Sequence, residues 1–215
     1  MGLASLSDAE LTRRIRAVPK VTLGKGAPKR MSLAGAQHKL LVVYRPEPDT
    51  LFEPVGATPS THSLKPNHPD ANAYASSVIN EFFTMRLAKE VGLVVPTVYR
   101  RYTPLPVYII ERFDRLIAPG DSPAQRRHII DACQLLNRSF LFKTEGNLEV
   151  LNEAVARCRQ KLVTRQRLFR WLVFNLLVGN DDNHLKNLSF TVDAGGIDLA
   201  PHYDLLATGV YHTPA

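Results

Sequence analysis

The chain has 215 residues, 45% of them hydrophobic, which is enough to bury a core in one large domain or in two lobes. Its net charge of +7 favours anionic partners. The basic residues are scattered, however, and do not form the periodic stripe with aromatic residues that is typical of a nucleic-acid-binding surface. The two cysteines are isolated, which argues against a disulfide framework and a cysteine-based zinc site. No apolar run is long enough to span a membrane, and the N-terminus has no secretory signal pattern. We therefore expect a cytoplasmic protein.

The first half of the sequence predicts a β-rich region with two helices. Ser7 and Glu10 have the spacing of a capping box and predict a short opening helix. A basic, glycine-containing loop follows from Gly24 to Ser32. Apolar residues at three- and four-residue steps predict a long helix from about Ala71 to Val91. β-Branched and aromatic runs predict strands at residues 40–44, 51–55, 62–65, 97–102 and 107–113.

The second half changes character and is mainly helical. Helical patterns occur at residues 129–136, 148–161 and 166–178, a polar segment spans 180–187, and a hairpin is predicted from strands 188–192 and 197–200. This order of elements predicts an α+β fold of the two-lobed protein-kinase type. We expect a β-rich lobe over residues 1–115 and a partial helical lobe over residues 116–215.

The polar segment after the most apolar helix carries the residues best suited to catalysis. Phosphoryl transfer needs a carboxylate to accept the proton of the attacking hydroxyl, a cation near the phosphate, and an oxygen ligand for Mg²⁺. Asp182, Lys186 and Asn187 offer these groups in that order, and Asp204, beyond the hairpin, offers a second Mg²⁺ ligand.

Two other interpretations of this polar segment remain open at the level of the residues alone. Clustered Asn and Asp side chains also satisfy backbone groups at a helix C-terminus, without any catalytic role. A zinc site through His184 is the weaker alternative, because no second His or Cys stands at ligand spacing.

The motif Asp182-Asn183-His184-Leu185-Lys186-Asn187, with Tyr203-Asp204 after it, resembles the catalytic and metal-binding loops of the HipA family of serine/threonine protein kinase toxins. Four further segments resemble, in chain order, its phosphate loop, the strand with its ATP-binding lysine, its adenine-contacting hinge and a helix below the hinge. They are residues 32–39, 61–66, 111–115 and 128–134.

The resemblance implies an ATP- and Mg²⁺-dependent kinase in which Asp182 and Lys186 are catalytic, Asn187 and Asp204 bind the metal, and Ser32 is autophosphorylated. The residues that it places around ATP are Ala34, Gly35, Ala36, Gln37, His38, Lys39, Lys65, Glu111, Arg112, Phe113, Asp114, His184 and Tyr203. Independently, small residues such as Gly35 let backbone amides approach phosphate, and Lys65 neutralises phosphate charge, with Glu81 or Glu90 on the following helix as its ion-pair partner.

The same resemblance implies a toxin with a helix-turn-helix antitoxin partner of the HipB type. The toxin would contact DNA only indirectly, through this antitoxin. The implied substrate is a translation component such as an aminoacyl-tRNA synthetase. Family members carry further segments before the phosphate loop and after the metal-binding aspartate, so we expect a chain that is short at both ends. Two alternatives are a nucleotide-binding subunit that completes a repressor complex without catalysis, and direct nucleic-acid binding by the basic loop.

Overall fold

The computed structural model describes residues 2–17, 39–116 and 124–211, and the chain divides into two compact units. Unit 1 comprises Met1–Phe82 and Thr97–Gln125, and unit 2 comprises Phe83–Pro96 and Arg126–Ala215. The predicted lobe boundary after residue 115 and the two-lobed arrangement stay predictions. In the described residues, no helix is both long and apolar enough to cross a membrane.

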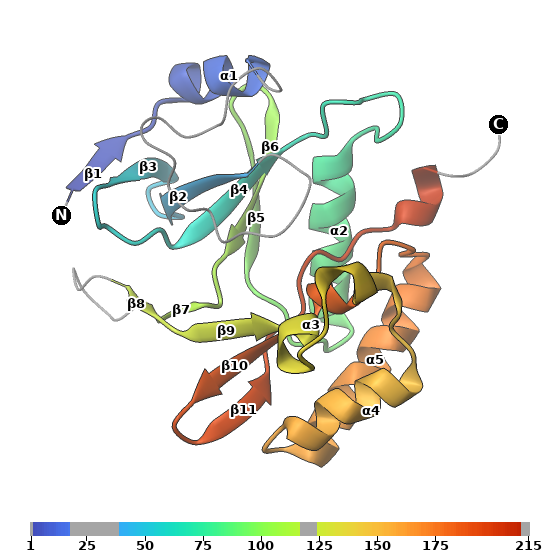
Figure 1. Ribbon diagram of the computed structural model, residues 1–215. Coiled ribbons are helices and arrows are strands. Elements are labelled where there is room, and N and C mark those ends of the chain that lie inside the picture. The colour runs from blue at the N-terminus through green and yellow to red at the C-terminus, as the bar shows by residue number, and fades with distance from the viewer. Residues whose placement is uncertain (1, 18–38, 117–123, 212–215) are drawn as a thin grey trace. The chain divides into compact units, whose positions relative to one another are not determined.

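Unit 1 is built on an antiparallel sheet of six strands in the order β1-β3-β2-β4-β6-β5 (Figure 1). Alternate apolar side chains of the central strands form one core, in which Leu64 pairs with Leu40 on one side and with Ile109 on the other. The strands are β1 (Gly2–Ser5), β2 (Leu40–Arg45), β3 (Thr50–Val55), β4 (His62–Pro66), β5 (Val98–Tyr102) and β6 (Pro106–Glu111).

Two helices accompany this sheet in the chain. Helix α1 (Asp8–Arg16) begins as predicted, because the Ser7 hydroxyl accepts a hydrogen bond from the Glu10 N–H, and its Leu11 is fully buried in the core of the sheet. Helix α2 (Ser77–Glu90) begins later than the predicted start at Ala71. The Asn67 side chain accepts from the N–H of Val78 in the first turn and so fixes the start of this helix.

Unit 2 contains a three-stranded antiparallel sheet in the order β11-β10-β9 and most of the helices (Figure 1). Its strands are β9 (His128–Asp131), β10 (Ser189–Asp193) and β11 (Gly196–Leu199), the last two forming the predicted hairpin. Its helices are α3 (Ala132–Leu135), α4 (Leu148–Arg157) and α5 (Lys161–Val178), with single 3-10 turns η1 (Phe140–Thr144), η2 (Leu185–Asn187) and η3 (Thr208–Tyr211). Where unit 1 ends in the chain, two short strands, β7 (Arg115–Leu116) and β8 (Gln125–Arg126), pair with each other.

The predicted helix over residues 129–136 is wrong in its first part. Ile129 and Ile130 belong to strand β9 and pair with Thr191 and Phe190 of β10. Helix α3 begins only after Asp131, whose side chain accepts from the Gln134 N–H while the Gln134 side chain accepts from the Asp131 N–H. Apolar residues at helical spacing therefore hid a strand of β-branched residues followed by a capped helix.

Candidate active site

A buried ion pair in unit 1 joins the sheet to helix α2. Lys65 Nζ lies 2.6 Å from Glu81 Oε1, and the two side chains are only 6% and 3% exposed. Lys65 projects from the central strand β4, and its ammonium also lies 5.7 Å from the centre of the Tyr108 ring. The predicted pairing of Lys65 with Glu81 is confirmed, while the predicted contact of Lys65 with ATP stays a prediction.

The predicted hinge follows strand β6, and its side chains bind one another. Arg112 is buried and donates to both carboxylate oxygens of Asp114, at 2.9 and 2.7 Å, and to the hydroxyl of Ser60 at 3.0 Å. Arg115 donates to the same carboxylate. Burial alone would raise the pKa of Asp114, but the hydrogen bonds and charges of Arg112 and Arg115 outweigh it and lower the pKa.

The backbone of the predicted hinge is also hydrogen-bonded within unit 1. The Glu111 N–H donates to the Thr97 carbonyl and the Arg112 N–H to the Thr61 carbonyl, so both of these donors are already engaged within unit 1. The Arg112 and Asp114 side chains form a rigid bidentate pair. The predicted contact of this segment with adenine stays a prediction, and the N–H groups of Glu111 and Arg112 are not free to make it.

The polar loop of unit 2 begins at the end of helix α5. Gly179 adopts the left-handed conformation, with φ of 66°, and ends the helix. The Asn180 side chain donates to the Asn175 side-chain oxygen at 2.7 Å, and Asn175 donates to the Trp171 carbonyl at 2.8 Å. The simple interpretation of the polar cluster as a helix C-cap therefore accounts for Asn180, and the residues after it remain to be explained.

Asp182 and Asn187 are joined within this loop. The Asp182 side chain is 68% exposed, and His184 Nε2 lies 4.0 Å from its Oδ1, too far for a hydrogen bond. Asn187 is buried, and its side-chain nitrogen donates to the Asp182 carbonyl at 3.0 Å. That bond uses the nitrogen end of the amide, so the oxygen end is the part of Asn187 suited to a metal ion.

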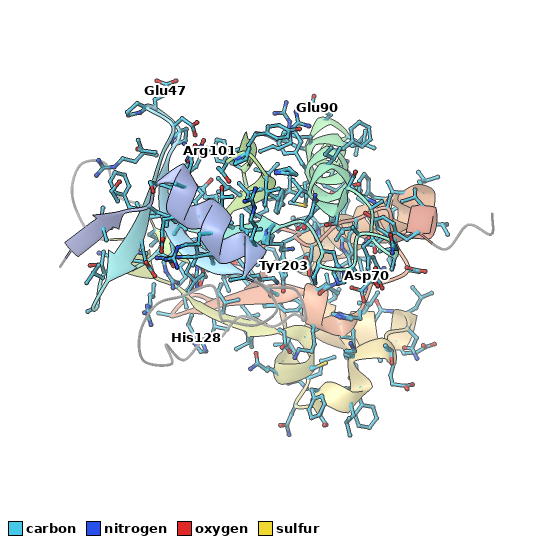
Figure 2. The ribbon with its side chains drawn as sticks, turned by 90° about the horizontal axis from the view of Figure 1, so that it is seen from above. Glu47, Asp70, Glu90, Arg101, His128 and Tyr203 are labelled. Carbon is cyan, nitrogen blue, oxygen red and sulfur yellow. The ribbon has the colours of Figure 1, made fainter. Side chains whose placement is uncertain are left out.

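The segment with Asp204 is attached to the polar loop. The Tyr203 hydroxyl, on the residue labelled in Figure 2, donates to the Lys186 carbonyl at 2.9 Å and lies 2.8 Å from the Ser189 hydroxyl. Asp204 has a positive φ of 58°, a conformation that is uncommon for non-glycine residues and that Asp adopts more readily than most. Tyr203 therefore connects the two loops that the sequence assigned to catalysis and to metal binding.

The buried His202 and the half-buried Arg167 support the approach to Asp204. The His202 ring stacks on Trp171 with 5.9 Å between ring centres, and the His202 backbone N–H donates to the Val94 carbonyl at 2.8 Å. Arg167 of α5 donates to the carbonyls of Leu199 and Ala200, both at 2.7 Å. Burial lowers the pKa of His202 to about 3, with a further contribution from the Arg167 charge.

Several predicted site residues lie outside this cluster or outside the described residues. Lys39, half-buried, directly precedes β2 in unit 1. The residues of the predicted phosphate loop that fall outside the described ranges are Ser32, Ala34, Gly35, Ala36, Gln37 and His38. In the part of the chain that the structure describes, no group of three or more His, Cys, Asp or Glu side chains could hold a metal ion, so Mg²⁺ at Asn187 and Asp204 would also need phosphate and water oxygens.

Sequence reasoning missed Thr208 and Ser189, which contact the two loops, and Arg167, which contacts the end of β11 before the Asp204 segment. Thr208 accepts a hydrogen bond from the Asp181 N–H at 2.7 Å. None of the three belongs to a motif with a chemical signature. Thr208 and Ser189 make these contacts through their hydroxyls, and Arg167 donates to backbone carbonyls. Only Thr208 gave a signal, because it lies shortly after Asp204 in a segment with little helical or strand pattern.

Comparison with known proteins gives consistent results. Residues 31–215 match the family model of the HipA-like C-terminal domain. The serine/threonine-protein kinase toxin HipA of Shewanella oneidensis is 38% identical over 201 residues, which cover 85% of this chain and 44% of that protein. The chain thus spans about half the length of such relatives.

Solved structures agree with the sequence comparison. The HipA of Shewanella oneidensis, in a structure with HipB and operator DNA, superposes with a TM-score of 0.81 and 33% identity, covering 99% of this chain and 52% of that one. The proinflammatory kinase CtkA of Helicobacter pylori superposes with a TM-score of 0.59 and 18% identity, covering 85% of this chain and 57% of that one, and shares the fold. The predicted mixed α and β fold is therefore one that kinases also adopt.

Proposed function

We propose that this chain, which belongs to the HipA-like C-terminal domain family, binds ATP with Mg²⁺ and transfers phosphate to a serine or threonine hydroxyl. The resemblance to the HipA family expected from the sequence motifs is confirmed by the family match and by the identity to a HipA toxin. The observation that carries the proposal is the hydrogen bond from the Tyr203 hydroxyl to the Lys186 carbonyl, which joins the loop of Asp182 to the segment of Asp204.

In this proposal the exposed Asp182 carboxylate orients the attacking hydroxyl and accepts its proton. Lys186 places a positive charge beside the transferred phosphate. Asn187 and Asp204 hold Mg²⁺, which would neutralise charge on the phosphate oxygens. In unit 1, the Lys65 ammonium, fixed by Glu81, binds phosphate oxygens. Each of these residues supplies binding, orientation or a proton acceptor, which is what phosphoryl transfer requires of a protein.

The biological role is inferred from the relatives. A HipA of the same family is a kinase toxin and is found with HipB and operator DNA. We therefore propose that this chain acts in a toxin–antitoxin system, with a HipB-type antitoxin as partner and DNA contacted only through it. The proposed substrate is a translation component, such as an aminoacyl-tRNA synthetase, and Ser32 is the proposed autophosphorylation site.

The decisive experiment is incubation with ATP and Mg²⁺, followed by mass spectrometry of the chain and of candidate substrates. Asp182→Asn should keep ATP binding and lower phosphate transfer by on the order of 10²-fold or more, because the proton acceptor is lost. Asp181→Asn is the matched control and should transfer phosphate at a rate close to that of the wild type.

Other outcomes would change the proposal. If Asp181→Asn loses transfer and Asp182→Asn retains it, the base is Asp181. If the wild-type chain binds ATP with Mg²⁺ and transfers no phosphate to itself or to any substrate, it is a nucleotide-binding subunit and the kinase proposal is wrong.

A further inference from the structure

Turn η3, which comes after the Asp204 segment, is bound to the end of helix α5. The Thr208 hydroxyl accepts a hydrogen bond from the Asp181 N–H at 2.7 Å and lies 3.2 Å from the Gly179 carbonyl, to which it donates. The Gly209 N–H donates to the same carbonyl at 2.8 Å. Thr208 is buried, and a Cβ added at Gly209 would stand only 3.2 Å from the Gly179 oxygen. Contact between the two segments is therefore close, and the Thr208 hydroxyl takes part in it both as donor and as acceptor.

The position of Asp182 depends on these backbone contacts. Its side chain is largely exposed and has no hydrogen bond to His184, so the location of its carboxylate depends on that of its own backbone. On one side of Asp182, the Asp181 N–H is held by Thr208. On the other side, the Asp182 carbonyl is held by the Asn187 side chain. The backbone of Asp182 is thus bracketed by two side-chain hydrogen bonds from different parts of unit 2.

We propose that Thr208 is a positioning residue for phosphoryl transfer, whose hydroxyl holds the Asp182 backbone in place and ties it to the segment that carries Asp204. The inference rests on the proposed function, since it concerns the same base and the same metal ligand. Asp204 precedes Thr208 by four residues, and the Tyr203 hydroxyl makes a second connection, to the Lys186 carbonyl. With Thr208 in place, the base and the metal ligand keep a fixed separation within unit 2.

The test compares Thr208→Val with Thr208→Ser. Valine has nearly the shape of threonine and cannot accept the Asp181 N–H, whereas serine keeps the hydroxyl. For Thr208→Val we expect kcat to fall on the order of tenfold or more, because small misplacements of a catalytic group are costly. KM for ATP should change less than about twofold, because its proposed contacts in unit 1 are untouched. Thr208→Ser should restore kcat to near the wild-type value.

A second measurement does not depend on activity. Hydrogen exchange of the Asp181 amide, monitored in the full chain without nucleotide, should be on the order of tenfold faster in Thr208→Val and near the wild-type rate in Thr208→Ser. If Thr208→Val does not fold, Thr208→Ala takes its place in both measurements.

The outcomes separate this inference from the proposed function. Normal kcat in Thr208→Val, or an equal loss in Thr208→Ser, would overturn the role of the hydroxyl. If the wild-type chain transfers no phosphate, the proposed function fails, and the amide exchange still decides whether Thr208 orders the loop. An Asp181 exchange rate that is the same in wild type and Thr208→Val would overturn the inference in either case.

Discussion

Two ion pairs involve glutamates of helix α2, and they differ in burial. The pair of Lys65 with Glu81 has a separation of 2.6 Å and side chains only 6% and 3% exposed, whereas that of Arg86 with Glu90 has a separation of 4.0 Å and exposures of 55% and 71%. Removing one partner of a buried pair leaves an uncompensated charge away from water, while exposed pairs contribute little because water and salt screen them.

Glu81→Gln should therefore lower the free energy of unfolding by roughly 3 kcal/mol, since Lys65 would remain charged and buried. Glu90→Gln changes the same residue type on the same helix and should cost less than about 0.5 kcal/mol. Urea unfolding of both variants measures the difference. Equal losses would mean that Lys65 reaches water or another carboxylate when Glu81 is neutral.

The sequence contained enough information for some single residues of the site and not for others. The pairing of Lys65 with a glutamate of the next helix was predicted, but the sequence left Glu81 and Glu90 as alternatives, and only the structure selects Glu81. The contact between Tyr203 and Lys186 joins residues 17 positions apart, and that between Thr208 and Asp181 joins residues 27 apart. Both form only when the intervening hairpin has folded, so local patterns do not encode them.

At the scale of elements, helices α2 and α5 end in the same way but lead into different segments. Gly92 terminates α2 and Gly179 terminates α5, with φ of 84° and 66° respectively. Residues with a side chain are disfavoured in this left-handed region of φ, because their Cβ comes too close to the backbone. After Gly179 the chain continues directly into the polar loop with Asp182.

Replacement of either glycine by alanine should cost roughly 1 kcal/mol of unfolding free energy, owing to the left-handed backbone. Only Gly179→Ala should also lower phosphate transfer, because it displaces the start of the polar loop. Unfolding and transfer are to be measured on both variants. If Gly92→Ala lost as much phosphate transfer as Gly179→Ala, the activity would not depend specifically on the turn at Gly179.

Element prediction succeeded where a local signal agreed with the final fold. The hairpin of β10 and β11 was predicted by its Asp193–Gly196 turn, and α1 by its N-terminal cap. Strand β1 was not predicted, since its four residues are all exposed and lack apolar alternation, and it exists through pairing with β3. Strand β9 was assigned to a helix because two adjacent isoleucines fit either period.

At the scale of the whole molecule, each unit contains a buried histidine that resists protonation. Burial lowers the pKa of His62 in unit 1 to about 4, and that of His202 in unit 2 to about 3. An unfolded histidine has a pKa of about 6.5. Below that pH the unfolded chain binds protons that the folded chain does not, so the free energy of unfolding decreases as the pH falls from about 6.5 towards about 4 and 3.

His202→Phe should reduce this pH dependence in unit 2. Phenylalanine can stack on Trp171 in the same way and takes up no proton. Between pH 7.5 and pH 5 the wild type should lose about 2 kcal/mol more unfolding free energy than the variant. Urea unfolding monitored by fluorescence of Trp171, the chain's single tryptophan, reports on this unit. The same loss in both proteins would show that His202 is already protonated when folded or is accessible to water.

The hydrogen bond from Asp181 to Thr208 also sets an order of events in protein synthesis. Thr208 is added 27 residues after Asp181, which at ribosomal rates of about 5–20 residues per second corresponds to roughly 1–5 s. During this interval the polar loop exists in the nascent chain without the hydroxyl that holds it. The polar loop can therefore reach the arrangement seen in this structure only after the segment with Thr208 has been made.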